Sequence, residues 1–324
     1  MPESTYQLEL RQATLDDAEL VADLEALRDP AAPPDPVFVR HYWKMTDKLE
    51  RSMRRIAVRD GEAIACAGAS HESWKDGEKR YGMIRVLLRG DMWSDARYGH
   101  LVRLAEDWLR HEGAEISVAR VRKSFARDLA AIELLGYLEI RQMRISELDL
   151  VAHREKILGT RELCRRQMRD QGVRMLVLSE DKDPEKYRKL HKTVVESEQD
   201  IPTVVPRRAL DFEDWRSFWF GSPAIREDKL WIAREGDDIV GTSVLDTPVV
   251  RGIPFTAYTG TSRAVRGRGI ARALKYESLG QAVEEGYARA RTNNDADNPA
   301  ILRINEEMGY RPIAPLIELH RALD

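Results

Sequence analysis

The stretch Arg266-Gly267-Arg268-Gly269-Ile270-Ala271 is a glycine-rich turn that opens a helix. It follows a strand-like run from Phe255 to Val265 and leads directly into a helical pattern that extends to Glu285. Glycines at a strand-to-helix turn let backbone N–H groups close on an anion, and the helix N-terminus adds positive potential. With two arginines in the same turn, the stretch predicts a binding site for a phosphate-bearing ligand.

A tight turn that binds nothing is the alternative interpretation. The Arg-x-x-Gly-x-Ala spacing is short enough to occur by chance, so its context has to support it. The spacing excludes a Walker-type loop, whereas the strand before the turn and the helix after it favour an anion site.

The two halves of the chain repeat the same order of elements. Asp60-Gly61 joins two strand-like runs and predicts a β-hairpin, and Glu235-Gly236-Asp237-Asp238 joins two more in the second half. Gly113 and Gly136 end successive helices, and Gly286 and Gly309 do so with the same spacing. The sequence therefore predicts an internal duplication.

A length of 324 residues exceeds a comfortable single core, so about two domains are expected. A charged helix from Arg154 to Asp170 separates the halves and places the boundary near residue 152, giving domains 1–151 and 152–324. Each half has α/β (α+β) order, with a central sheet covered by helices on both faces.

Composition and charge exclude several classes of function. A net charge of -3 gives no field that would draw the chain onto nucleic acid or an anionic membrane. There is no apolar run long enough to cross a membrane and no signal peptide at Met1, so we expect a cytoplasmic protein. Cys66 and Cys164 lie too far apart for a disulfide framework or a zinc knuckle, and no metal is expected.

These residues resemble the GNAT N-acetyltransferase superfamily. Its Arg/Gln-x-x-Gly-x-Gly/Ala motif matches Arg266, Gly269 and Ala271, and a second signature, an Asn ahead of a Gly-aromatic pair, matches Asn298 before Gly309-Tyr310. The resemblance implies two tandem GNAT folds, each a mixed, mostly antiparallel central sheet flanked by helices. The architecture is similar to that of mycothiol synthase.

The resemblance also implies acetyl-CoA as the cofactor, held by the C-terminal half. Asn298 has a structural alternative, because Asn followed by proline is a common helix cap. The cofactor-binding candidates are Thr261, Arg263, Arg266, Gly267, Arg268, Gly269, Ile270, Ala271, Asn298 and Asn305.

The catalytic residues are less determined. GNAT enzymes often place a Tyr general acid where this chain has Asn305, so Tyr258 and Tyr310 are the substitutes. Glu198, in an acidic run before Pro202, is the candidate for receiving the amine. Other candidates for the base are Glu196, Asp200, Asp246 and His320.

The N-terminal half lacks these features. Applying the offset of the repeat puts Trp93, Ser94 and Ala96 where the second half has Arg266, Gly267 and Gly269. Phe125 and Ile132 likewise replace Asn298 and Asn305. We therefore expect a catalytically silent, degenerate GNAT-like domain in the first half.

The resemblance implies an acetyl-CoA-dependent N-acyltransferase that transfers an acetyl group to a primary amine by direct attack. A small-molecule amine is the expected acceptor, and the protein is expected to be a monomer or a homodimer. The alternatives are a peptide or protein acetyltransferase and a non-catalytic CoA-binding protein, the latter favoured by Asn305 at the general-acid position.

Overall fold

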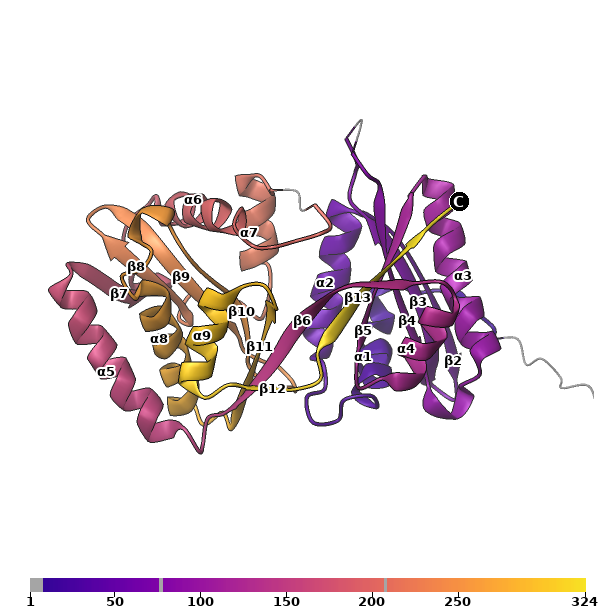
Figure 1. The fold of residues 1–324 in the computed structure, drawn as a ribbon, viewed down its shortest axis with the longest axis horizontal. Coiled ribbons are helices and arrows are strands. Elements are labelled where there is room, and N and C mark those ends of the chain that lie inside the picture. The colour runs from indigo at the N-terminus through magenta and orange to yellow at the C-terminus, as the bar shows by residue number, and fades with distance from the viewer. Residues whose placement is uncertain (1–7, 76–77, 207–208) are drawn as a thin grey trace, which may run out of the picture. The chain divides into compact units, whose positions relative to one another are not determined.

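The computed structural model describes residues 8–75, 78–206 and 209–324 of the chain. By residue contacts it divides into two compact units (Figure 1). Unit 1 comprises Met1–Met143, Val250–Gly252 and Ala314–Asp324, and unit 2 comprises Arg144–Val249 and Ile253–Ile313. The units change at Met143, ahead of the expected boundary, and the last residues of the chain belong to unit 1.

Unit 1 is built on a sheet with the strand order β1-β2-β3-β4-β5-β13-β6. Among the described residues of this unit, β4 and β5 pair in parallel, and the other neighbouring strands pair antiparallel. The strands are β1 (Arg11–Gln12), β2 (Arg51–Arg59), β3 (Glu62–His71), β4 (Tyr81–Leu88), β5 (Ile116–Arg122), β6 (Leu138–Asp149) and β13 (Leu316–Ala322). The helices are η1 (Leu15–Asp17), α1 (Ala18–Ala26), α2 (Pro36–Leu49), η2 (Gly90–Met92), α3 (Asp95–Glu112) and α4 (Ala126–Leu134).

The C-terminal strand β13 completes the sheet of unit 1. It lies between β5 and β6 and pairs antiparallel with both, as the yellow strand in Figure 1 shows. Ile317 and Leu319 are buried in the core of unit 1, while Glu318 accepts hydrogen bonds from Arg120 and Arg141. The expected second domain, residues 152–324, includes β13, whereas the contacts of β13 place it in unit 1.

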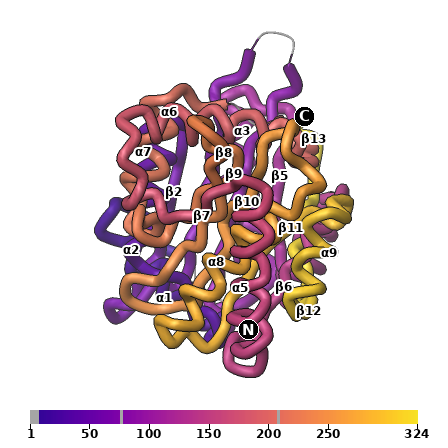
Figure 2. The backbone as a smooth tube through the Cα atoms, turned by 90° about the vertical axis from the view of Figure 1, so that its left-hand side faces the viewer, coloured from indigo at the N-terminus to yellow at the C-terminus, as the bar shows by residue number. Residues whose placement is uncertain are grey.

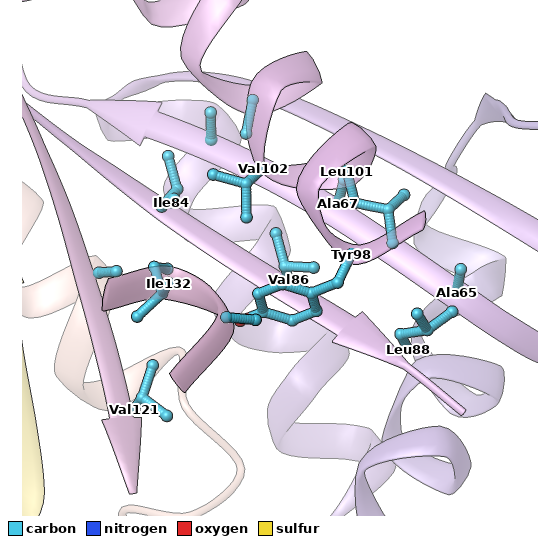
Figure 3. Packing of buried hydrophobic residues seen from close by; sticks show 14 of the residues in the cluster. Ala65, Ala67, Ile84, Val86, Leu88, Tyr98, Leu101, Val102, Val121 and Ile132 are labelled. Atoms are coloured by element: carbon cyan, nitrogen blue, oxygen red, sulfur yellow. The ribbon is translucent and has the colours of Figure 1, made fainter. Parts of the chain in front are cut away.

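The core of unit 1 lies between the sheet and α3 (Figure 3). Tyr98 and Leu101 of α3 point toward small and branched side chains of the strands, among them Ala67 of β3 and Val86 of β4. Ile132 of α4 adds to the same cluster. Its full burial explains why the first half keeps an apolar residue at this position.

The Asp60-Gly61 hairpin is confirmed. β2 and β3 pair antiparallel on either side of it, and both turn residues have positive φ, 52° at Asp60 and 80° at Gly61. Positive φ at both central residues is the geometry that makes Asp-Gly a hairpin signal.

In unit 2 the strand order of the sheet is β6-β11-β10-β9-β8-β7 (Figure 2). Its strands after β6 are β7 (Val173–Val177), β8 (Leu230–Glu235), β9 (Asp238–Asp246), β10 (Phe255–Thr261), β11 (Arg289–Asp295) and β12 (Arg311–Pro312), which pairs with β6. Its helices are α5 (Arg154–Asp170), η3 (Leu178–Glu180), α6 (Lys186–Glu198), α7 (Phe212–Phe220), η4 (Arg263–Val265), α8 (Ile270–Glu284) and α9 (Pro299–Met308).

The sheet of unit 2 is covered on both faces. On one, called the α8 face, Leu274 of α8 and Met168 of α5 pack with Leu245 of β9. On the other, called the α6 face, Val194 of α6 and Trp219 of α7 pack with neighbouring strand residues. The expected α/β architecture, a mixed and mostly antiparallel sheet flanked by helices, is confirmed.

Within the described part of the chain, no helix is both long and apolar enough to cross a membrane. Nor does that part bring three or more His, Cys, Asp or Glu side chains together as a metal site. Cys66 and Cys164 are both buried free thiols.

Candidate functional site

The glycine-rich turn of unit 2 follows β10, which pairs with its neighbour β11 only at its start among the described residues. β10 pairs in parallel with β11 only at Phe255–Arg291 and Thr256–Thr292 among the described residues. Its register with β9 then shifts between Thr256 and Tyr258, which is a β-bulge. A bulge bends a strand and redirects its side chains. β10 therefore reaches the turn without β11 beside it.

The turn leaves the start of α8 open. Gly267 and Gly269 have φ of 77° and 85°, a left-handed conformation that favours glycine. Gly269 is the N-cap of α8, and no side chain caps the helix. The first N–H groups of a helix have no intrahelical partner, so those that begin at Ile270 are available to an anion.

Two arginines of the turn converge on one carboxylate. Arg266 Nη2 lies 2.6 Å from Asp200 Oδ2, and Arg263 Nη2 lies 2.8 Å from Asp200 Oδ1. Arg263 and Arg266 hold the pKa of the Asp200 carboxyl well below its usual range. An acidic side chain thus stands where the turn gathers positive charge. Arg268 is directed elsewhere, with Nη2 2.9 Å from Glu235 Oε1.

Asn294, Asn298 and Asn305 follow Thr292, the last residue of β11 that pairs with β10. Asn298 is the N-cap of α9, where its side chain accepts a hydrogen bond from the Ile301 N–H at 3.4 Å. Asn305 is buried and donates to Asn294 Oδ1 at 2.7 Å. The Asn305 Oδ1 atom has no hydrogen-bond partner among the described residues. A buried acceptor of this kind is expected to have a partner, so a ligand N–H would satisfy it.

The other residues predicted to bind the cofactor can offer it mainly backbone groups, because their side chains are largely buried. Thr261 ends β10 opposite Gly241 and is buried. Ile270 is buried in the core of unit 2, so only its N–H can face the turn. Ala271 follows in the first turn of α8 and is half-buried.

The catalytic candidates lie on opposite faces of the sheet. Tyr258 Oη lies on the α6 face, 2.5 Å from Ser197 Oγ, and Glu198 is the exposed last residue of α6. Tyr310 Oη lies on the α8 face, 3.3 Å from Thr256 Oγ1. Burial raises the pKa of both phenols, that of Tyr310 to about 12. The structure thus brings Tyr258 and Glu198 together and leaves Tyr310 apart from them.

The candidates for the base are also separated. Glu196 accepts from the Arg263 N–H at 2.8 Å, and Asp200 is bound to the arginines. His320 is on β13 in unit 1, where it contacts Glu318, so it is not part of unit 2. Asp246, the last residue of β9, is different, because burial alone raises its pKa to about 7. Its burial depends on packing that no local sequence pattern reveals.

The corresponding turn of unit 1 is shorter and closed. Only Trp93 and Ser94 separate η2 from α3, whereas Arg266–Gly269 separates η4 from α8. Ser94, rather than Ala96, therefore stands at the position of Gly269, which corrects the offset used on the sequence. The Ser94 side chain accepts a hydrogen bond from the Arg97 N–H at 3.2 Å. The ring centres of Trp93 and Tyr98 are 4.7 Å apart.

Unit 1 nevertheless has a cavity of about 400 Å³ between β4 and β5. Its wall is apolar at Val86, Tyr98 and Phe125. Arginine–carboxylate pairs surround this wall: Arg28–Asp128, Arg85–Glu25 and Arg122–Asp29. Because the Ser94 side chain caps the start of α3, this cavity lacks an uncapped helix start like that of α8 in unit 2.

No protein-family model matches the chain, and no curated protein sequence matches it either. Its structure is similar to a GCN5-related N-acetyltransferase from Sphaerobacter thermophilus, with TM-score 0.67 and 20% identity over 97% of this chain and 95% of that one. A tandem GNAT protein from the clavulanic acid biosynthesis pathway has TM-score 0.73 and 14% identity, over 98% and 99%. FemX has TM-score 0.59 and 13% identity, over 97% of each chain. The chain therefore has the tandem GNAT fold.

Proposed function

We propose that this chain is an acetyl-CoA-dependent N-acetyltransferase and that unit 2 binds the acetyl donor. The observation that carries this proposal is the uncapped start of α8 behind Gly267 and Gly269. A Cβ built at Gly267 meets no atom within 4 Å, so the turn is open for a ligand. The similar structures include an N-acetyltransferase and a tandem GNAT protein, which supports the same function.

The residues of the turn fit the diphosphate of the donor. The N–H groups of Ile270 and Ala271 point out of the helix start, and Arg266 and Arg263 add charge beside them. Asn305 Oδ1 offers a buried acceptor for an amide N–H of the donor. We assign no phosphate contact to Arg268, since its side chain is directed toward Glu235 and Gln171 rather than toward Asp200 and the other two arginines.

Acetyl-CoA supplies a thioester-activated acetyl group when bound. Tyr258 keeps its phenol proton at neutral pH, because burial raises its pKa, and it holds that proton on Oη beside Ser197. This makes Tyr258 the better placed of the two tyrosines to donate a proton on the α6 face. Glu198 adds negative charge near Tyr258 and would attract a cationic primary amine.

Turnover tests the proposal directly. Acetyl-CoA is incubated with a panel of primary amines, the released thiol is followed with a colorimetric reagent, and acetylated products are identified by mass spectrometry. We expect amine-dependent thiol release, lost in an Arg266→Ala/Gly269→Glu variant and kept in Arg89→Ala, an arginine just before η2 in unit 1. Thiol release that is absent with all amines would contradict an N-acetyltransferase.

A non-catalytic acetyl-CoA-binding protein is the second candidate, favoured by one observation. Asn305 stands where the family often has a Tyr acid, and its amide is bound to Asn294 rather than free to transfer a proton. Under this alternative the wild type binds acetyl-CoA with the same sensitivity to Arg266→Ala/Gly269→Glu, yet releases no thiol with amines or with peptides.

A further inference from the structure

Asp246 lies on the face of the sheet that carries Tyr258. It ends β9 directly opposite Phe255, and Val244, two residues earlier, is opposite Tyr258. Directly opposed residues share a face, and residues two apart on a strand do so as well. Val244 and Tyr258 pack with α6 and α7, so the Asp246 side chain is also on the α6 face.

Asp246 is partly buried, and one oxygen of its carboxyl is shielded from solvent. Its Oδ1 atom has no hydrogen-bond partner among the described residues. Burial is the only cause that raises its pKa, to about 7. A buried carboxylate without a partner is costly, so such a group is expected to meet a cation or to take up a proton.

The charged groups of neighbouring elements do not supply that cation. Before β8, Arg226 pairs with Asp228 and Lys229 pairs with Glu285. On β8, Arg234 pairs with Asp181 and Asp183, and Glu235 pairs with Arg268. On α7 Arg216 lies over the Tyr187 ring, and the end of α6 carries the anionic Glu196 and Glu198. On β11, Arg291 is opposite Phe255 and pairs with Glu147. None of these groups shifts the Asp246 pKa.

Aromatic side chains surround this part of the α6 face. The rings of Trp219 and Tyr258 are 5.7 Å apart, and Trp215 lies 5.1 Å from Trp219. Phe255 is the register partner of Asp246. Aromatic faces together with a carboxylate favour an organic ammonium group over water.

We propose that Asp246 binds the ammonium group of the acceptor and removes its proton. In that step one N–H bond of the ammonium breaks, its electron pair stays on nitrogen, and an O–H bond forms on Asp246. The proton then passes to water and restores the carboxylate. The acceptor is a monocationic amine with an uncharged, apolar body. This inference rests on the proposed function and adds the substrate class of its site.

Ligand binding tests the assignment without turnover. Phenethylamine and hexylamine are titrated by NMR into the whole chain at pH 5.5 and pH 8, beside the neutral counterparts 2-phenylethanol and 1-hexanol. Both amines stay cationic at both pH values, so a difference reports the ionisation of Asp246. For a carboxyl that titrates near pH 7, we expect about thirtyfold tighter amine binding at pH 8 and no change for the alcohols.

Two variants make the result specific. Asp246→Asn, which keeps the shape of the side chain, is expected to lose at least about tenfold in amine affinity at pH 8, together with the pH dependence. Asp238→Asn, an exposed residue at the other end of β9, is the matched control and should behave as the wild type. Amines that bind no more tightly than their alcohols, or an Asp246→Asn variant that keeps affinity and pH dependence, would overturn the assignment.

A separate titration of acetyl-CoA distinguishes the two proposals. Amine binding that depends on Asp246, with no acetyl-CoA bound, supports the ammonium site and contradicts the acetyltransferase. Acetyl-CoA binding and turnover with an unaltered Asp246→Asn variant contradict the Asp246 assignment alone.

Discussion

Arg266 donates a hydrogen bond to Asp200, with 2.6 Å between Nη2 and Oδ2. Arg263 binds the same carboxylate, so both arginines of the proposed anion site are engaged by an acidic side chain of the chain itself. A phosphate group that enters the site must compete with Asp200 for these two arginines.

Replacing Asp200 should therefore strengthen donor binding. We expect the Asp200→Asn variant to bind acetyl-CoA about three- to tenfold more tightly at low salt, with a smaller gain at high salt, where exposed charges are screened. Calorimetric titration measures the change, with Asp238→Asn as an exposed control. Unchanged or weaker binding would show that Asp200 does not compete with the ligand.

A substitution at Gly269 tests whether the turn requires a left-handed backbone conformation. Its φ of 85° is unfavourable for any residue with a Cβ. Gly269→Ala should lower the free energy of unfolding by about 1 kcal/mol and weaken acetyl-CoA binding. Gly159→Ala, within α5 and with open space around its Cβ, should instead raise stability by about 0.5–1 kcal/mol. Denaturant unfolding measures the change in the free energy of unfolding for both variants. Equal changes in the two variants would show that the backbone at Gly269 is not strained by a Cβ.

Lys275 gives a pH signature of folding. It is buried on α8, 5.3 Å from the Tyr310 ring centre, and its Nζ has no hydrogen-bond partner among the described residues. Burial lowers its pKa from 10.5 to about 7. Between these values the unfolded state binds more protons than the folded state, so stability should rise with pH from 7 to 10.

Lys275→Met should remove that rise and stabilise the protein at pH 7 by about 2 to 4 kcal/mol. Urea unfolding at several pH values measures both effects, with the exposed Lys192→Met as the control. A variant that keeps the wild-type slope between pH 7 and 10 would show that Lys275 is charged in the folded state.

The strand β13 should be essential to unit 1. Ile317 and Leu319 are buried in its core, and β13 fills the space between β5 and β6. A chain that ends at Pro315 should expose unit 1 to limited proteolysis, with cleavage sites concentrated in residues 8–143. A truncated chain as resistant as the full one would contradict the assignment of β13.

Local patterns in the sequence predicted the parts of the fold that local physics determines. Asp60-Gly61 forms the predicted hairpin, Gly113 and Gly309 end their helices with positive φ, and α5 spans the predicted Arg154–Asp170. The place of β13 in unit 1 could not be predicted in this way, because its partners β5 and β6 lie far away in the sequence. The alternation of apolar and polar residues along β13 fits the sheet of either unit.

The candidate site was predicted only in part, for a similar reason. The open turn at Gly267 and Gly269 follows from the glycine spacing. The engagement of both arginines by Asp200 and the burial of Asp246 depend on how α6 and α7 pack on the sheet. The turn of unit 2 is two residues longer than that of unit 1, so a constant offset between the halves aligned the two turns incorrectly.

Calorimetric titration of acetyl-CoA into the wild type and into the Arg266→Ala/Gly269→Glu variant tests the central claim most directly. The open turn predicts a single micromolar site in the wild type that the variant loses, because the new carboxylate repels the diphosphate at the start of α8. Failure of the wild type to bind, or a variant that binds equally well, would contradict an acetyl-CoA site in unit 2.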